Sequence, residues 1–214
     1  AFHTALTTKP NQADVFWWDF TMQCPMLQDI IYEDERCAIF IDGPSIHQIC
    51  RSLDVDIDYR ALRSIFAEAG YLVQARFYAT IANDQSYSPL RPLIDWLSYN
   101  GFVVVTRSGR AGQDDEAAQR GDRSILVELA VDALELSAKL EHVILFSGNG
   151  DFLRLIQSLQ RRTVRTTIVG PAIGTSSMVS DDLRRQADTY IDLRTLLPFV
   201  AKRRQQPAQL HQTA

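Results

Sequence analysis

Two short apolar stretches of this sequence each lead into a turn that contains glycine and an acid. Residues 37–41 are followed by Asp42 and Gly43, and residues 142–146 are followed by a turn that reaches Asp151. Glycine allows a ligand to approach the backbone closely. If the two stretches are neighbouring strands of a parallel sheet, their terminal polar side chains meet at the edge where ligands bind in such folds.

A third acid, Asp132, lies within the otherwise apolar helical stretch 124–138, and Glu128 precedes it by one helical turn. An acid in an apolar stripe needs a partner, because burial of an unpaired charge is costly. Converging oxygens are the ligands that Mg²⁺ prefers, and a bound metal activates water and offsets charge on a scissile phosphate. Simpler interpretations stay open: Asp42 and Asp151 could cap the helices that follow them, and Asp132 could pair with an arginine.

The elements that must position these acids alternate between strands and helices from residue 36 onward. Short apolar or alternating runs predict strands at residues 37–41, 71–81, 102–106, 142–146, 164–170 and, at an edge, 189–193. Helical spacing and helix-ending residues predict helices at residues 58–70, 88–101, 124–138, 150–162 and 176–187, with another opening after Asp42. This alternation predicts a three-layer α/β/α sandwich with a central, mostly parallel sheet.

The polar stretch 107–123 interrupts this pattern and is predicted to be a long loop, either functional or disordered. It carries Arg107 and Arg110, and a second basic cluster, at Arg161 and Arg162, lies between a helix and a strand. Arginines contact phosphate groups, so both clusters are candidate RNA-binding sites. Acidic neighbours offset the charge of the loop, and a solvated mixed-charge surface is the simpler interpretation of both clusters.

The chain divides into three segments by composition. Residues 1–35 form an N-terminal arm, residues 36–200 form the α/β domain, and residues 201–214 form a polar, flexible tail. The arm is rich in aromatic residues and methionine, and such a segment is a liability when it is exposed. We therefore expect the arm either to pack on its own domain or to dock on a protein partner.

The composition is ordinary for a soluble globular protein, with 46% hydrophobic and 22% charged residues. A net charge of -4 does not indicate nucleic-acid binding. The apolar runs are too short for a membrane span. The cysteines Cys24, Cys37 and Cys50 form neither a disulfide framework nor a zinc pattern, which favours the cytoplasm or another reducing compartment such as an organelle matrix.

Over residues 36–195 the chain resembles a bacterial NYN domain, in the LabA-like branch of the PIN-like nuclease superfamily. The stretches that carry the resemblance are, in order, CAIFIDGPSIH, SPLRPLIDWLSYNGF, VELAVDALEL, VILFSGNGDFLRLIQSLQRRTVR and SDDLRRQADTYIDL. The resemblance implies a PIN-like α/β/α sandwich and descent from a ribonuclease that depends on Mg²⁺ or Mn²⁺.

The resemblance also implies which residues form the pocket. Three acids match the catalytic and metal-binding pattern of the family: Asp42, Asp132 and Asp151. Three positions depart from it and are degenerate: Ser45 replaces an asparagine, and Leu126 and Asn149 each replace an aspartate. The loss of two carboxylates weakens the binding of a hard divalent cation. Glu128 is a possible substitute for one of them.

We therefore expect a catalytically degenerate NYN domain, a pseudoenzyme that acts by binding protein or RNA. A protein partner is expected at the N-terminal arm. The alternative is an active Mg²⁺- or Mn²⁺-dependent endoribonuclease that uses the remaining acids. Metal binding near those acids distinguishes the two hypotheses.

Overall fold

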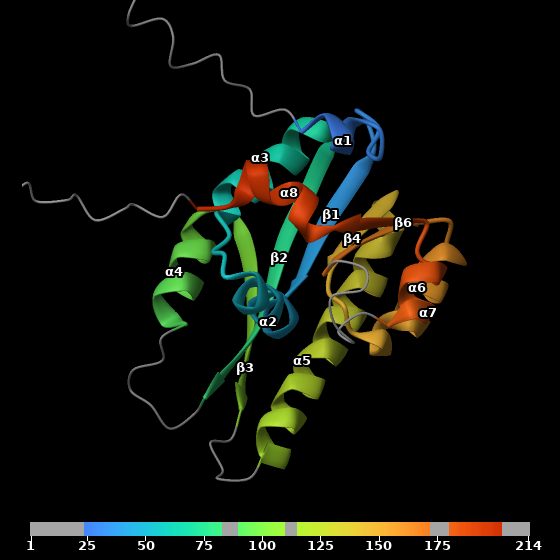
Figure 1. The fold of residues 1–214 in the computed structure, drawn as a ribbon. Coiled ribbons are helices and arrows are strands. Elements are labelled where there is room, and N and C mark those ends of the chain that lie inside the picture. The colour runs from blue at the N-terminus through green and yellow to red at the C-terminus, as the bar shows by residue number, and fades with distance from the viewer. Residues whose placement is uncertain (1–23, 83–89, 110–114, 172–179, 203–214) are drawn as a thin grey trace, which may run out of the picture.

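A six-stranded parallel sheet forms the centre of the molecule, with helices on both faces (Figure 1). The computed structural model describes residues 24–82, 90–109, 115–171 and 180–202. The strand order is β3-β2-β1-β4-β5-β6. The strands are β1 (Arg36–Asp42), β2 (Tyr71–Ala82), β3 (Phe102–Gly109), β4 (His142–Phe146), β5 (Arg165–Gly170) and β6 (Thr189–Asp192). The predicted α/β/α sandwich is confirmed.

Two apolar cores lie on the two faces of the sheet. One is covered by α1 (Pro25–Gln28), α2 (Gly43–Leu53), α3 (Tyr59–Ala69), α4 (Arg91–Tyr99) and α8 (Leu193–Val200). The other is covered by α5 (Asp115–Leu136), α6 (Leu153–Gln160) and α7 (Asp181–Gln186). Short 3₁₀ helices, η1 (Ser137–Lys139) and η2 (Gly150–Phe152), flank β4.

The strands β1 and β4 are paired at the centre of the sheet. All residues of β4 are buried, as a continuous apolar run in a parallel sheet predicts. From β1 the chain moves outward through β2 and β3, and it returns to the other side of β1 as β4. The strand order therefore reverses between β1 and β4. Asp42 and the turn after Phe146 lie at this reversal point, where ligands bind in such folds.

The prediction of a long loop at residues 107–123 is wrong at both ends of that stretch. Strand β3 continues to Gly109, and α5 already begins at Asp115. Residues 115–120, DEAAQR, lack apolar periodicity but are mostly good helix formers with acids in the first turn. Helix α8 was not predicted, since Pro198 lies inside it; the Asp192 carboxylate begins it by accepting a hydrogen bond from the Arg194 backbone N–H.

Residues 24–35 pack on the domain rather than extending from it. Cys24, Leu27 and Ile31 are buried in the core that α3 covers. Residues 1–23 and 203–214, which hold the rest of the predicted arm and most of the predicted tail, lie outside the described residues. None of the described helices combines the length and the hydropathy needed to cross a membrane.

Candidate functional site

Asp42 lies at the carboxyl end of β1 and begins α2. Its Oδ1 accepts a hydrogen bond from the Ser45 backbone N–H over 3.2 Å, the usual contact of an acidic helix cap. Its Oδ2 accepts a hydrogen bond from the Ser147 hydroxyl over 2.7 Å. Asp42 is buried, with 2% of its surface exposed, and its hydrogen bond with Ser147 links the carboxyl ends of β1 and β4. The capping interpretation therefore holds for this acid.

The turn after β4 is held by hydrogen bonds of its own. The Asn149 N–H donates to the Ser147 hydroxyl over 3.1 Å, and the Asp151 N–H donates to Asn149 Oδ1 over 3.0 Å. The Gly148 N–H donates to the Ser45 hydroxyl over 3.1 Å. Asn149 is thus the cap of η2, whereas Asp151 is exposed and caps neither η2 nor α6. Ser45 and Asn149, two of the degenerate positions, thus stabilise this turn by accepting hydrogen bonds from its backbone.

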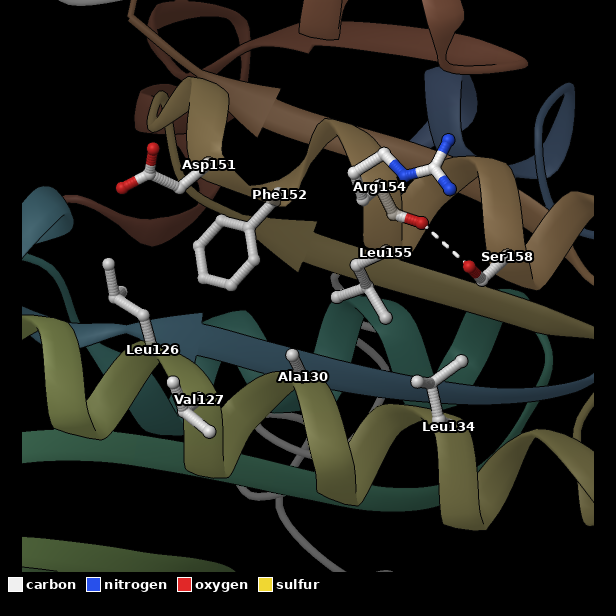
Figure 2. A pocket seen from close by; sticks show the side chains of 9 residues that line it. All are labelled: Leu126, Val127, Ala130, Leu134, Asp151, Phe152, Arg154, Leu155 and Ser158. Carbon is white, nitrogen blue, oxygen red and sulfur yellow. Dashed lines mark hydrogen bonds between the residues drawn. The ribbon is translucent and has the colours of Figure 1, made fainter.

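A groove of about 400 Å³ lies between α5 and α6, beside Asp151 (Figure 2). We call it the α5/α6 groove; it is lined by Leu126, Val127, Ala130, Leu134, Asp151, Phe152, Arg154, Leu155 and Ser158. Leu126 and Asp151 lie toward one end, and Leu134 and Ser158 lie toward the other. The position that the resemblance assigns to an aspartate therefore presents an isobutyl group, which offers no ligand to a cation.

Asp132 contacts the sheet and does not line the α5/α6 groove. Its Oδ2 lies 3.0 Å from Arg76 Nη2 and accepts a hydrogen bond from the Tyr78 hydroxyl over 2.8 Å. Burial, together with the hydrogen bond to Asp132, raises the pKa of Tyr78 above its ordinary value, so the hydroxyl stays a donor. Of the two interpretations of Asp132, the partner of an arginine is the one observed.

Glu128, the possible substitute ligand, also has an arginine partner. It forms an ion pair with Arg107 at the end of β3. Arg107 was itself expected to contact RNA, and this pairing offsets its charge. The two acids on this side of α5, Glu128 and Asp132, thus each bind an arginine of a neighbouring strand, which fixes the helix over β2 and β3.

The remaining acids do not converge on one point. Among the side chains that the structure describes, no group of three or more His, Cys, Asp or Glu residues is arranged to hold a metal ion. Mg²⁺ needs several oxygen ligands, and its affinity rises with their summed charge. In this arrangement Asp42, Asp132 and Asp151 do not fit a bound Mg²⁺ or Mn²⁺. Their assignment as catalytic residues or metal ligands stays a prediction.

The predicted RNA-binding arginines that the structure describes lie at opposite ends of the parallel strands. Arg107 lies near the carboxyl end of β3, whereas Arg161 and Arg162 precede β5 and lie at the amino edge. Arg162 donates to the Leu134 carbonyl oxygen over 3.0 Å and so caps α5. Arg110 lies outside the described residues. The structure therefore does not join Arg107 to Arg161 and Arg162 in one surface.

A buried polar cluster at the amino edge was not predicted. The Glu35 carboxylate accepts a hydrogen bond from Arg165 over 2.8 Å and lies 3.1 Å from His142 Nδ1. His142 Nε2 lies 2.7 Å from the Thr167 hydroxyl, and burial lowers the pKa of this histidine despite the nearby carboxylate. The cluster fastens the start of β1 to β4 and β5, at the edge opposite Asp42.

Two features of this site had signals in the sequence. Arg76 is the charged residue in the otherwise apolar or neutral strand YLVQARFYATI, and such a residue needs an acidic partner. The stretch LVELAVDALEL has apolar residues around more of the helix than one buried face requires, which indicates a second apolar surface on α5.

Residues 36–196 match the NYN domain family. The chain is 28% identical over 175 residues to the low amplitude and bright protein LabA of Synechococcus elongatus. The aligned region covers 80% of this chain and 90% of LabA. The crystal structure of VPA0982, a protein of unknown function from Vibrio parahaemolyticus, matches with a TM-score of 0.61 at 24% identity, over 76% of this chain and 94% of that one. This last likeness concerns the fold alone. Because the family match extends from β1 through β6, the chain belongs to the NYN domain family.

Proposed function

We propose that this chain is a NYN domain without metal-dependent nuclease activity, and that it acts by binding another protein. The observation that carries the proposal is the apolar character of the α5/α6 groove beside Asp151. Leu126 lies in that groove at a position where an active member of the family is expected to have an aspartate. An apolar groove offers no ligand to a divalent cation, whereas burial of a partner's apolar side chain in it favours binding.

The acids that remain have structural partners, which supports the loss of catalysis. Asp42 caps α2 and accepts a hydrogen bond from Ser147, and Asp132 is bound by Arg76. Glu128, which could replace a lost ligand, is paired with Arg107. For Asp132 and Glu128 to bind a metal ion, each carboxylate would first have to break its ion pair with an arginine.

A protein fits the exposed surface better than RNA does. Val127 is 62% exposed and Val131 is 47% exposed, one turn apart on α5 beside the groove. Contiguous exposed apolar surface is typical of protein interaction sites. RNA requires a run of unpaired cations, but Arg107 is paired with Glu128 and lies at the edge opposite Arg162.

The nuclease part is tested by titrating Mn²⁺ into the protein by calorimetry and by measuring RNA cleavage in parallel. Three proteins are compared: the chain itself, the double variant Leu126→Asp with Asn149→Asp, and a control with Leu134→Asp and Asn149→Asp. The control has the same charge, but its new carboxylate lies toward the other end of the groove. We expect Mn²⁺ binding only in the first double variant. Micromolar Mn²⁺ binding and RNA cleavage by the unaltered chain would show an active ribonuclease instead.

The binding part is tested by affinity purification with the chain, a Val131→Glu variant and a Tyr99→Glu variant. Tyr99 is 90% exposed and lies on α4, which covers the other face of the sheet, so it controls for added surface charge. A partner held by the chain and by Tyr99→Glu, but lost by Val131→Glu, supports binding through α5. A partner held equally by the chain and both variants contradicts it.

A further inference from the structure

Helix α5 has more apolar surface than the domain covers. Ile125, Leu129 and Ala133 are fully buried against the sheet. Val127, which lines the α5/α6 groove, is 62% exposed, and Val131, one helical turn further along, is 47% exposed. A helix that is apolar on both its inner and its outer surface is expected to be covered on both. Among the described residues, the sheet covers the inner surface and α6 lies beside the helix, but Val127 and Val131 stay exposed.

The groove favours an occupant with large apolar side chains and acidic groups. Its floor is formed by leucines, Ala130 and Phe152, and Arg154 lies on its α6 side (Figure 2). Arg161 and Arg162 follow α6 at the Leu134 end and are exposed. Apart from Asp151 at the opposite end, the charged side chains near the groove on α6 are therefore basic.

The segment 14–22 of this chain, DVFWWDFTM, has these properties. It holds Phe16, Trp17, Trp18 and Phe20, with Asp14 and Asp19 beside them. Burial of aromatic side chains contributes more free energy than burial of most others, and exposed aromatic runs favour association. We propose that residues 14–22 occupy the α5/α6 groove of their own chain, with the aromatic side chains against the apolar floor and Asp19 toward the arginines of α6.

The segment has to pass around the amino ends of the strands to make this contact, because Cys24 belongs to the core on one face of the sheet and the α5/α6 groove lies on the other face. Cys24 and the residues after it are packed at the amino edge of the sheet, where the Ile30 carbonyl oxygen accepts a hydrogen bond from Arg165. The Leu134 end of the groove lies at the same edge, because Arg162, which precedes β5, donates to the Leu134 carbonyl oxygen. An extended chain covers about 3.5 Å per residue, so residues 20 to 14 reach roughly 14 to 35 Å from Cys24.

The groove itself is short compared with this reach. Leu126 and Leu134 are two helical turns apart, which corresponds to roughly 12 Å along α5. Residues 14–22 can therefore follow the groove from its Leu134 end toward Asp151. A protein that binds the groove then has to displace this segment, and this consequence alone rests on the proposed function.

The test uses the fluorescence of the arm tryptophans in the full chain. The tryptophans are Trp17, Trp18 and Trp96, so subtracting the spectrum of a Trp17→Phe, Trp18→Phe variant separates the signal of the two arm tryptophans from that of Trp96. The same difference is measured in a Val127→Glu background and in a Val103→Glu background. Val103 is a matched control, because it is 40% exposed and lies on the edge strand β3 outside the groove.

We expect a blue-shifted arm spectrum that resists acrylamide quenching, moves to the red in Val127→Glu, and is unchanged in Val103→Glu. A solvent-exposed arm spectrum in the unaltered chain overturns the proposal and leaves a partner protein as the occupant. A spectrum that depends on protein concentration overturns it in favour of the groove of a second copy. Equal responses to both glutamates overturn the assignment to this groove. Each outcome is independent of the Mn²⁺ titration, so the two proposals fail separately.

Discussion

The Asp132 carboxylate lies 3.0 Å from the Arg76 guanidinium, and this ion pair joins the C-terminal half of α5 to β2. The two side chains are 21% and 16% exposed, so the pair is partly shielded from solvent. The Tyr78 hydroxyl donates to the same carboxylate oxygen. An aspartate in the apolar stretch of α5 is therefore explained by its partners in the sheet, and a metal ion is not needed to account for it.

Replacement of Arg76 tests this structural role. We expect Arg76→Met to lower the free energy of unfolding by about 2–4 kcal/mol, because it leaves the shielded Asp132 carboxylate with an uncompensated charge. Addition of Asp132→Asn should recover part of that loss, since a neutral amide needs less compensation. Urea denaturation measures both. The control is Arg107→Met, whose more exposed pair with Glu128 should contribute less than about 1 kcal/mol; equal losses for the two arginines would contradict the expectation.

A comparison of Asp42 with Asp151 separates structural from functional acids. Asp42→Ala removes a helix cap and the acceptor of the Ser147 hydroxyl, so we expect a loss of about 2–3 kcal/mol in unfolding free energy. Asp151→Ala should change it by less than about 0.5 kcal/mol, because that side chain is exposed. A stabilising effect of Asp42→Ala would instead indicate a carboxylate kept for ligand binding at the expense of stability.

The sheet could be predicted from the sequence because its central strands are continuous apolar runs bounded by turns. The sequence placed Asp42 near the turn after Phe146 only on the condition that the two strands are neighbours, and the pairing of β1 with β4 meets that condition. The start of α5 could not be predicted from periodicity, because the sequence of its first turns, DEAAQRGD, contains no apolar stripe.

The partners of the site acids were harder to predict than their positions. Nothing within α5 identifies Arg76 or Arg107 as the residues that face it, since both belong to strands far away in the sequence. Leu126 was recognised as a departure from the family pattern. That it opens onto an apolar groove depends on the packing of α6 beside α5, which only the folded chain establishes.

The stability of the protein should fall on mild acidification because of His142. Burial holds the pKa of its imidazole below the ordinary value of 6.5, against the opposing effect of Glu35; Arg165 lowers the pKa further, and Asp188 raises it. As the pH falls below 6.5, His142 binds a proton in the unfolded state but not in the folded state. The free energy of unfolding therefore decreases with falling pH until the pH reaches the pKa of His142 in the folded state.

This decrease is measured by urea denaturation between about pH 5 and pH 7.5, the range in which histidines titrate. We expect a His142→Gln variant to be less stable at neutral pH, because it disturbs the contacts with Glu35 and Thr167, but to show a flatter pH dependence. If acidification stabilises the unaltered chain, the imidazole is charged in the folded state and its pairing with Glu35 outweighs burial.

The cysteines should be unreactive in the folded protein. Burial raises the pKa of the Cys50 thiol to about 11 and that of Cys37 to about 12, and nearby acids, Asp56 and Glu35, add to the rise. Only the thiolate attacks a disulfide reagent, so both thiols should react slowly near pH 8 and rapidly in urea. A Tyr99→Cys variant supplies a control thiol at a 90% exposed position and should react at once. Fast modification of Cys50 in the native chain would mean that α2 opens readily, since Cys50 is packed against the core between that helix and its neighbours.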